Sequence, residues 1–295
     1  MIQYFEMAKR IFFATILGAA SFFFTFNAGG KTMPFHCPQD TAEINLLIGE
    51  LKSAGSSLGD KITAAAVAFA DSPEDDYYST DSIADLRLNI DSFTPLMLVN
   101  NAIALARAAD YPGSPDWRTF QSELENIACR KGENNGFTSI MYHTSDWIGD
   151  NTARGNVREL TEDYPGVEVR TKSLDEMTRN RSNYAALSDS ITFETVRMTE
   201  MGFRTHRIPT LKRETIKKRE MVEDLRSGDI LILVPYGEGK DFYDMGIVTL
   251  EQDGPHLIHL SPQTRKVEKE AEPLARYLGP LAKYYQGIRL VRVKD

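Results

Sequence analysis

The sequence predicts an α+β protein in which a helical first half precedes a mainly antiparallel sheet. Between residues 40 and 130, apolar side chains recur at the three-to-four-residue spacing of a helix face. After residue 155 the chain instead contains short apolar runs rich in β-branched residues, separated by turn residues. Because the helices come first and the strands follow, we expect the N-terminal helices to pack against one face of the sheet.

Four helices are expected in the first half of the chain. They cover residues 42–54, 58–70, 95–109 and 116–129. The third has the clearest beginning, because Thr94 is a suitable N-cap and Pro95 suits the first helical position, where no backbone N–H is needed. The fourth ends at Cys129, before an Arg-Lys-Gly sequence typical of a helix C-terminus.

The strands expected in the second half differ in how strongly the sequence indicates them. Residues 156–164 alternate only loosely, whereas residues 230–236 form a continuous apolar run typical of a buried strand. Residues 245–261 indicate two strands joined by a Gln-Asp-Gly turn. Residues 287–293 are expected to form the last strand.

The N-terminus has the pattern of a secretory signal. Lys9 and Arg10 precede an apolar stretch at residues 11–26, and small residues follow at 28–30. The apolar stretch is short for a membrane-spanning helix, which needs about 20 apolar residues. We therefore expect a signal peptide over residues 1–29, with a retained anchor as the alternative and membrane contact only in that case. Residues 30–57 are expected to form an extension with one helix, and residues 58–295 the main domain.

The net charge and the two cysteines bear on nucleic-acid binding and on disulfide formation. A net charge of −8 disfavours general binding of nucleic acid. Cys37 and Cys129 are the two cysteines of the chain, and an exported protein could join them in a disulfide or leave both as thiols. Their spacing does not decide between these outcomes.

A set of ordered sequence blocks resembles a known family over roughly residues 58–292. The blocks are NIDSF and VNNAIALA within 89–106, YHTSDWIGDN at 142–151, MTRNRSNYAAL at 177–187, RIP at 207–209, SGDILIL at 227–233, DFYDMGIV at 241–248, HLIHLS at 256–261 and GIRLVR at 287–292. They resemble the N-acetylmuramoyl-L-alanine amidase-like family, domain of unknown function 1460, in the papain-like clan of bacterial cell-wall cysteine peptidases. The resemblance implies a papain-like fold for residues 58–295 and a place in the periplasm or envelope of a bacterium.

The same resemblance implies that the family's catalytic residues are replaced. The family places a nucleophilic Cys at a helix N-terminus, where free amides and the helix dipole stabilise a thiolate. A His on a neighbouring strand activates it, and a third polar residue orients that His. The matching positions here are Pro95, Asp244 and His259. Proline has no reactive side-chain atom, so the resemblance implies a protein without cysteine catalysis.

Two alternatives remain open. A shift of three residues in register makes Ser92 the nucleophile, with Thr94 as a second candidate, in an amide hydrolase that uses His259. The other alternative is a structural envelope protein whose cleft is filled. The first predicts a hydroxyl within hydrogen-bond reach of His259, and the second predicts an apolar plug.

The preferred interpretation is an exported, catalytically inactive protein that binds peptidoglycan-derived peptides, or another envelope peptide or glycan, in the former active-site cleft. The candidate ligand-binding residues are Tyr142, Ser145, Asp146, Trp147, Asp244 and His259. For two of them another role is open, with Trp147 in the core and Asp146 as a helix cap. No cofactor is expected. The spacing of His206 and His256 is not that of metal ligands, so no metal site is expected either.

Overall fold

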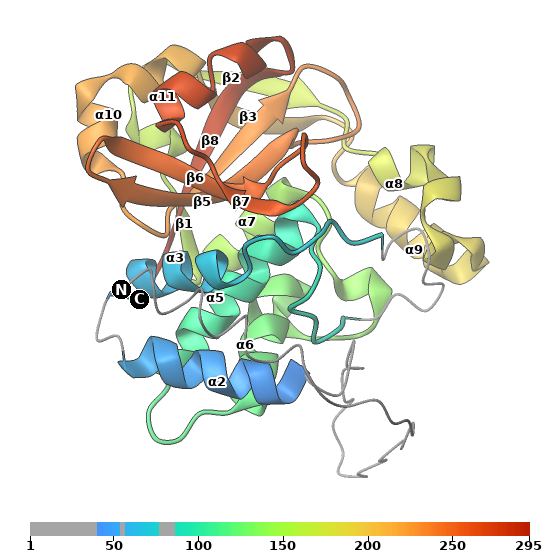
Figure 1. Ribbon diagram of the computed structural model, residues 1–295. Coiled ribbons are helices and arrows are strands. Elements are labelled where there is room, and N and C mark those ends of the chain that lie inside the picture. The colour runs from blue at the N-terminus through green and yellow to red at the C-terminus, as the bar shows by residue number, and fades with distance from the viewer. Residues whose placement is uncertain (1–39, 54–56, 77–85) are drawn as a thin grey trace. The chain divides into compact units, whose positions relative to one another are not determined.

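The structure is a computed structural model that describes residues 40–53, 57–76 and 86–295 (Figure 1). The predicted signal peptide and Cys37 lie outside the described residues, so processing of the N-terminus and pairing of the cysteines remain predictions. In the part of the chain that is described, no helix has the length and apolar character needed to cross a membrane. The described residues belong to one compact unit, Met33–Asp295.

The sheet of this unit contains eight strands among the described residues. They are β1 (Val157–Glu159), β2 (Val167–Lys172), β3 (His206–Leu211), β4 (Ile230–Pro235), β5 (Asp244–Glu251), β6 (Gly254–Leu260), β7 (Val267–Lys269) and β8 (Tyr285–Val293). Their order is β2-β3-β8-β4-β5-β6-β7, and β1 pairs with β8. Every pairing is antiparallel. The predicted α+β class is confirmed.

The N-terminal helices cover one face of this sheet. They are α2 (Asp40–Ser53), α3 (Leu58–Ala68), α5 (Pro95–Asp110) and α6 (Trp117–Ala128), followed by α7 (Thr144–Ala153). The central helix is α5, in which every residue from 98 to 106 is buried. Its side chains share one core with Met245 and Ile247 of β5 and Ile258 of β6. The helix expected in the 30–57 extension is α2, and it contributes Ile44 and Ile48 to this same core.

The opposite face of the sheet is also covered, by short helices from the second half of the chain. There α10 (Arg219–Asp224) and α11 (Leu274–Tyr277) pack on side chains such as Val248 of β5 and Leu257 of β6. The reason is visible in β4, where five consecutive apolar residues are buried. A strand with no polar alternation has no face to give to water.

A smaller group of helices follows β2 and precedes β3. It includes α8 (Glu176–Arg179) and α9 (Ser190–Met201). Met177, Tyr184 and Leu187 form its own apolar cluster with Phe137. This group supplies one wall of the cleft described below.

Local sequence signals located α2, α3, α5 and α6 and the strands β4, β5, β6 and β8 within one or two residues, whereas α7 to α11 were not among the expected helices. Thr94 is the N-cap of α5, with its hydroxyl oxygen 3.4 Å from the backbone N of Met97. The expected hairpin is formed by β5 and β6. The strand expected over residues 156–164 is limited to β1, and β2, β3 and β7 were not expected, because these short strands carry charged or proline residues that weaken the apolar pattern.

Candidate functional site

A cleft with a volume of about 690 Å³ opens where α5 begins. Its lining comprises Glu74, Asp75, Asp76, Thr94, Pro95, Leu96, Tyr142, Glu176, Asn183, Tyr184, Pro235, Gly237, Glu238, Lys240, Phe242, Tyr243 and Arg265. These residues come from the loop before α5, the start of α5, the loop before α7, the group around α8, the β4–β5 connection and the β6–β7 connection. The cleft therefore lies at the helix terminus where the family resemblance places a nucleophile.

The start of α5 is stable without a reactive side chain. Pro95 occupies the first turn, where its missing N–H costs no hydrogen bond. Ahead of it, the hydroxyl of Ser92 donates to Oδ2 of Asp75 at 2.8 Å. The side-chain amide of Asn89 donates to the same carboxylate oxygen at 2.8 Å. Ser92 is thus part of a network that holds the loop before the helix.

The lining lacks the side chains that nucleophilic hydrolysis ordinarily uses. Among the described residues that form it there is no cysteine, serine or histidine. Thr94 has the one aliphatic hydroxyl in that set, and its oxygen accepts the capping hydrogen bond from Met97. A nucleophile needs a base in hydrogen-bond reach, and the described lining offers carboxylates, one lysine and tyrosine hydroxyls for that role but no imidazole.

Charge in the cleft is unequal. Five carboxylates, from Glu74, Asp75, Asp76, Glu176 and Glu238, face two cationic side chains, Lys240 and Arg265. Nζ of Lys240 lies 3.2 Å from Oε1 of Glu176, and Arg265 forms an ion pair with Glu74. An excess of carboxylates attracts ammonium groups. A ligand carboxylate would have to compete with Glu176 and Glu74 for the two cations.

Tyr142 lines the cleft together with Tyr184. The hydroxyl of Tyr184 donates to that of Tyr142 at 2.8 Å, and the two rings meet edge to face with centroids 5.6 Å apart. Phe242 and Tyr243 supply further aromatic surface. Aromatic side chains beside polar groups suit recognition of peptides or sugars.

The other residues expected to line the groove near Tyr142 lie elsewhere. Trp147 is fully buried and donates from Nε1 to Oδ1 of Asn100 at 2.9 Å, so it belongs to the core under α5. Ser145 is 5% exposed, and its hydroxyl accepts from Nη1 of Arg289 at 2.8 Å. Asp146 is ion-paired with Arg130 at 2.5 Å. The expectation that these three contact a ligand is corrected, because the first turn of α7 faces the protein interior.

Asp244 and His259 are brought together, as the sequence suggested, but away from the cleft. Oδ2 of Asp244 lies 2.7 Å from Nδ1 of His259, and both side chains are fully buried. Gly246 of β5 pairs directly with His259 of β6, and a Cβ at Gly246 would lie 2.7 Å from the Cβ of His259. Only glycine allows the imidazole to occupy this position.

The two residues lie on the face of the sheet opposite α5. Side chains alternate along a strand, and Met245 and Ile247 of β5 pack in the core with α5. Asp244 and His259 therefore share the other face of the sheet. Leu257 of β6 and Tyr277 of α11 lie on this same side. Their expected role as cleft ligands is corrected for this geometric reason.

The hydrolase alternative is not supported by this arrangement. The second ring nitrogen of His259, Nε2, lies 2.9 Å from Oε1 of Glu270, so carboxylates occupy both nitrogens. Burial alone would lower the pKa of His259, but the hydrogen bonds and charges of Asp244 and Glu270 outweigh it and raise the pKa to about 9. The structure brings neither Ser92 nor Thr94 to this imidazole.

His143 is a buried histidine that joins two helices through its ring. It is 4% exposed, and its Nε2 lies 3.0 Å from Oε1 of Glu200 in α9. The same carboxylate accepts the backbone N–H groups of Met177 and Thr178. This carboxylate therefore joins the start of α7 to α8 and α9.

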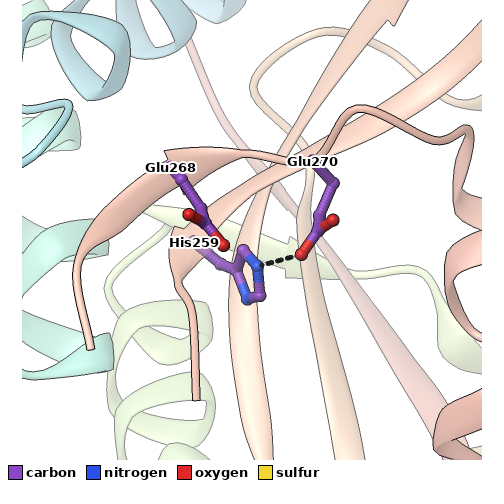
Figure 2. Close-up of side chains that lie close together, drawn as sticks. All are labelled: His259, Glu268 and Glu270. Carbon is purple, nitrogen blue, oxygen red and sulfur yellow. Dashed lines mark hydrogen bonds and ion pairs between the residues drawn. The ribbon is translucent and has the colours of Figure 1, made fainter. Parts of the chain in front are cut away.

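A group of side chains suited to a metal ion occurs beside the Asp244–His259 pair. Among the described residues it comprises His259, Glu268 and Glu270, whose nearest ligand atoms lie within 4.8 Å of one another (Figure 2). His206 lies outside this group, and His256 hydrogen-bonds Asp253 and the backbone oxygen of Glu270. Residue spacing does not predict this group, because His259 meets Glu268 only through the pairing of β6 with β7.

Comparison with known proteins identifies the family. A family model described as N-acetylmuramoyl-L-alanine amidase-like matches residues 76–282, well over half of the chain. The chain belongs to this family. The resemblance inferred from the ordered blocks is thereby confirmed, and it connects this amidase-like protein with the bacterial cell wall. A comparison with curated proteins found no match.

Solved structures share the fold. A crystal structure of an N-acetylmuramoyl-L-alanine amidase from Bacteroides uniformis is 21% identical, covers 81% of this chain and 100% of its own, and superposes with a TM-score of 0.71. A Legionella pneumophila protein of the DUF1460 family is 16% identical, with 87% and 95% coverage and a TM-score of 0.66. These likenesses establish the amidase-like fold of this family member.

Proposed function

We propose that this amidase-like protein is exported and binds a peptidoglycan-derived peptide, without cleaving it, in the cleft at the start of α5. The observation that carries the proposal is the open cleft with Pro95 at the helix start and no Cys, Ser or His among its described lining residues. Its volume of about 690 Å³ also argues against a filled, purely structural site. Export to the periplasm or envelope rests on the signal pattern in residues 1–29.

The charges of the cleft favour a ligand with both ammonium and carboxylate groups. Peptidoglycan stem peptides carry both. We assign the ammonium-binding role to Glu176 and Glu238 rather than to Asp244, because both glutamates line the cleft and Asp244 is buried elsewhere. Lys240, whose side chain is 48% exposed, is placed to receive a ligand carboxylate.

The direct test is to mix the full chain with a disaccharide-tripeptide that contains diaminopimelate. Calorimetry would measure binding, and mass spectrometry would detect cleavage products. We expect one ligand per chain with an affinity in the micromolar to millimolar range, and no cleavage. Robust amide hydrolysis would contradict the inactive assignment, and the absence of binding would contradict the ligand assignment.

Lys240→Ala is expected to weaken this binding about tenfold, since one charge-assisted hydrogen bond contributes roughly 1.5 kcal/mol. Lys212→Ala is the matched control. Lys212 is also a half-exposed lysine with a glutamate partner, Glu168, 2.9 Å away, but it lies outside the cleft. Equal affinity of the two variants would show that the ligand binds elsewhere.

A further inference from the structure

The carboxylates around His259 at the sheet edge carry more negative charge than the neighbouring cationic side chains neutralise. Asp244, Glu268 and Glu270 surround His259, which offers at most one positive charge. Among the described residues, no lysine or arginine forms an ion pair with any of these three carboxylates. Lys269, which lies between the two glutamates in sequence, points to Glu251 at 2.7 Å. Partly buried carboxylates ordinarily pair with cations or coordinate metals.

The imidazole is oriented as a metal ligand would be. Nδ1 of His259 is bound by Oδ2 of Asp244 at 2.7 Å, which leaves Nε2 on the side of Glu270 and Glu268. Metal-binding histidines usually give their other nitrogen to a carboxylate, which fixes the ring and its tautomer. In Figure 2 the carboxylates of both glutamates point towards the ring.

An unsatisfied atom provides an independent sign of a missing partner. Asp244 is 1% exposed, yet its Oδ1 has no hydrogen-bond partner. Its Oδ2 also accepts a long hydrogen bond of 3.5 Å from the hydroxyl of Tyr277 in α11. A buried carboxylate oxygen left without a donor costs free energy, and a cation bound next to the imidazole would reduce that cost electrostatically.

We propose that His259, Glu268 and Glu270 form a binding site for a divalent transition-metal ion, with Asp244 as the residue that orients the imidazole. Mixed imidazole and carboxylate ligands suit Zn²⁺ and Mn²⁺ better than the all-oxygen sites of Ca²⁺ and Mg²⁺. The ion would take the place of the proton between Nε2 of His259 and Oε1 of Glu270.

The dimensions are compatible with one ion. Ligand atoms about 2.1 Å from a metal lie within about 4.2 Å of one another, and the three nearest atoms here lie within 4.8 Å. A small rotation of the Glu268 side chain closes this difference. Both glutamates are partly exposed, so an ion can enter from solvent.

The location indicates a structural metal. The site joins β6 to β7 and lies under α11, whose Tyr277 ring meets His259 edge to face at 5.4 Å. None of its ligands lines the cleft, so the site is separate from the proposed peptide-binding surface. Loss of metal is therefore expected to reduce stability and to leave cleft chemistry unchanged.

The test uses tag-free full-length protein stripped of metal with a chelator and dialysed. Titration with zinc chloride or manganese chloride is followed by calorimetry and by thermal melting. We expect one ion per chain with a Kd below about 10 μM, and a melting temperature roughly 5 °C higher near saturation. Absence of saturable binding by both metals overturns the proposal, and so does binding of Ca²⁺ or Mg²⁺ with equal affinity.

Two variants locate the ion. Glu268→Gln and Glu270→Gln keep side-chain size and are each expected to weaken metal binding at least tenfold, while melting close to wild type in chelator. Glu251→Gln is the control, since Glu251 is an exposed acid on the neighbouring strand β5 outside the ligand group. If both ligand variants bind metal as tightly as this control, the ion binds elsewhere and the assignment is wrong.

Discussion

At the scale of single residues, position 95 has a proline at the helix start where the family resemblance places a nucleophilic cysteine. Proline fits the first turn of α5 because that position needs no N–H donor. The helix therefore begins normally at a residue that has no reactive side-chain atom. No histidine occurs among the described residues of the cleft lining.

A single substitution tests whether the nucleophile alone is missing. Pro95→Cys would place a thiol at the helix N-terminus, where the dipole favours the thiolate. We expect no muropeptide hydrolysis, because His259 lies on the other face of the sheet and holds carboxylates on both nitrogens. Mass spectrometry of the digest measures this, with Pro95→Ala as the control. Cleavage by the cysteine variant alone would show that a competent base lies near position 95.

At the scale of elements, the register of the β5–β6 hairpin decides which side chains face α5 and which face the opposite layer. Gly246 pairs with His259, and Ile247 with Ile258, so successive residues face opposite layers. A shift of one residue would exchange the two faces. The close contact at Gly246, where a Cβ would lie 2.5 Å from the backbone oxygen of Ile258, requires glycine at this point of the ladder.

Two glycine substitutions are expected to change stability in opposite directions. Gly246→Ala should destabilise the fold by about 2 kcal/mol or more, because the new methyl group overlaps backbone atoms. Gly49→Ala should stabilise it by about 0.5–1 kcal/mol, since Gly49 is exposed within α2 and a Cβ there has no atom within 4 Å. Urea denaturation measures both. Equal effects of the two changes would contradict the hairpin packing described above.

At the scale of the whole molecule, the sequence predicted the layers better than the site. Helix periodicity and caps depend on neighbours in sequence, so α2, α3, α5 and α6 were located correctly. The site depends on contacts that local patterns do not contain. Whether Asp244 faces α5 follows from strand register, and the meeting of His259 with Glu268 follows from an edge pairing of two strands. Trp147 was ambiguous because an aromatic residue on a helix fits either a groove or a core.

The pH dependence of the free energy of unfolding tests the buried contact between His143 and Glu200. Burial lowers the pKa of His143, but its hydrogen bond with Glu200 and the charges of Asp241 and Asp146 outweigh this, so the pKa is raised. The pKa of the neighbouring His206 is instead lowered, first by burial and then by the charge of Arg289. The folded state then binds the proton more tightly than the unfolded chain, whose His titrates near 6.5. The stabilisation is complete below that pH and is lost as pH rises through the higher folded pKa.

Urea denaturation of wild type and His143→Gln at pH 6 and pH 8.5 would measure this contribution. We expect the wild type to lose more stability than the variant as pH rises, because the variant lacks the proton that is released at this site. His256 and His259 are present in both proteins. Subtracting the stability loss of the variant from that of the wild type therefore removes their contributions. Glu200→Gln should likewise reduce the pH dependence, since it removes the carboxylate that holds the proton on His143. An identical loss in wild type and His143→Gln would contradict a protonated His143 in the folded state.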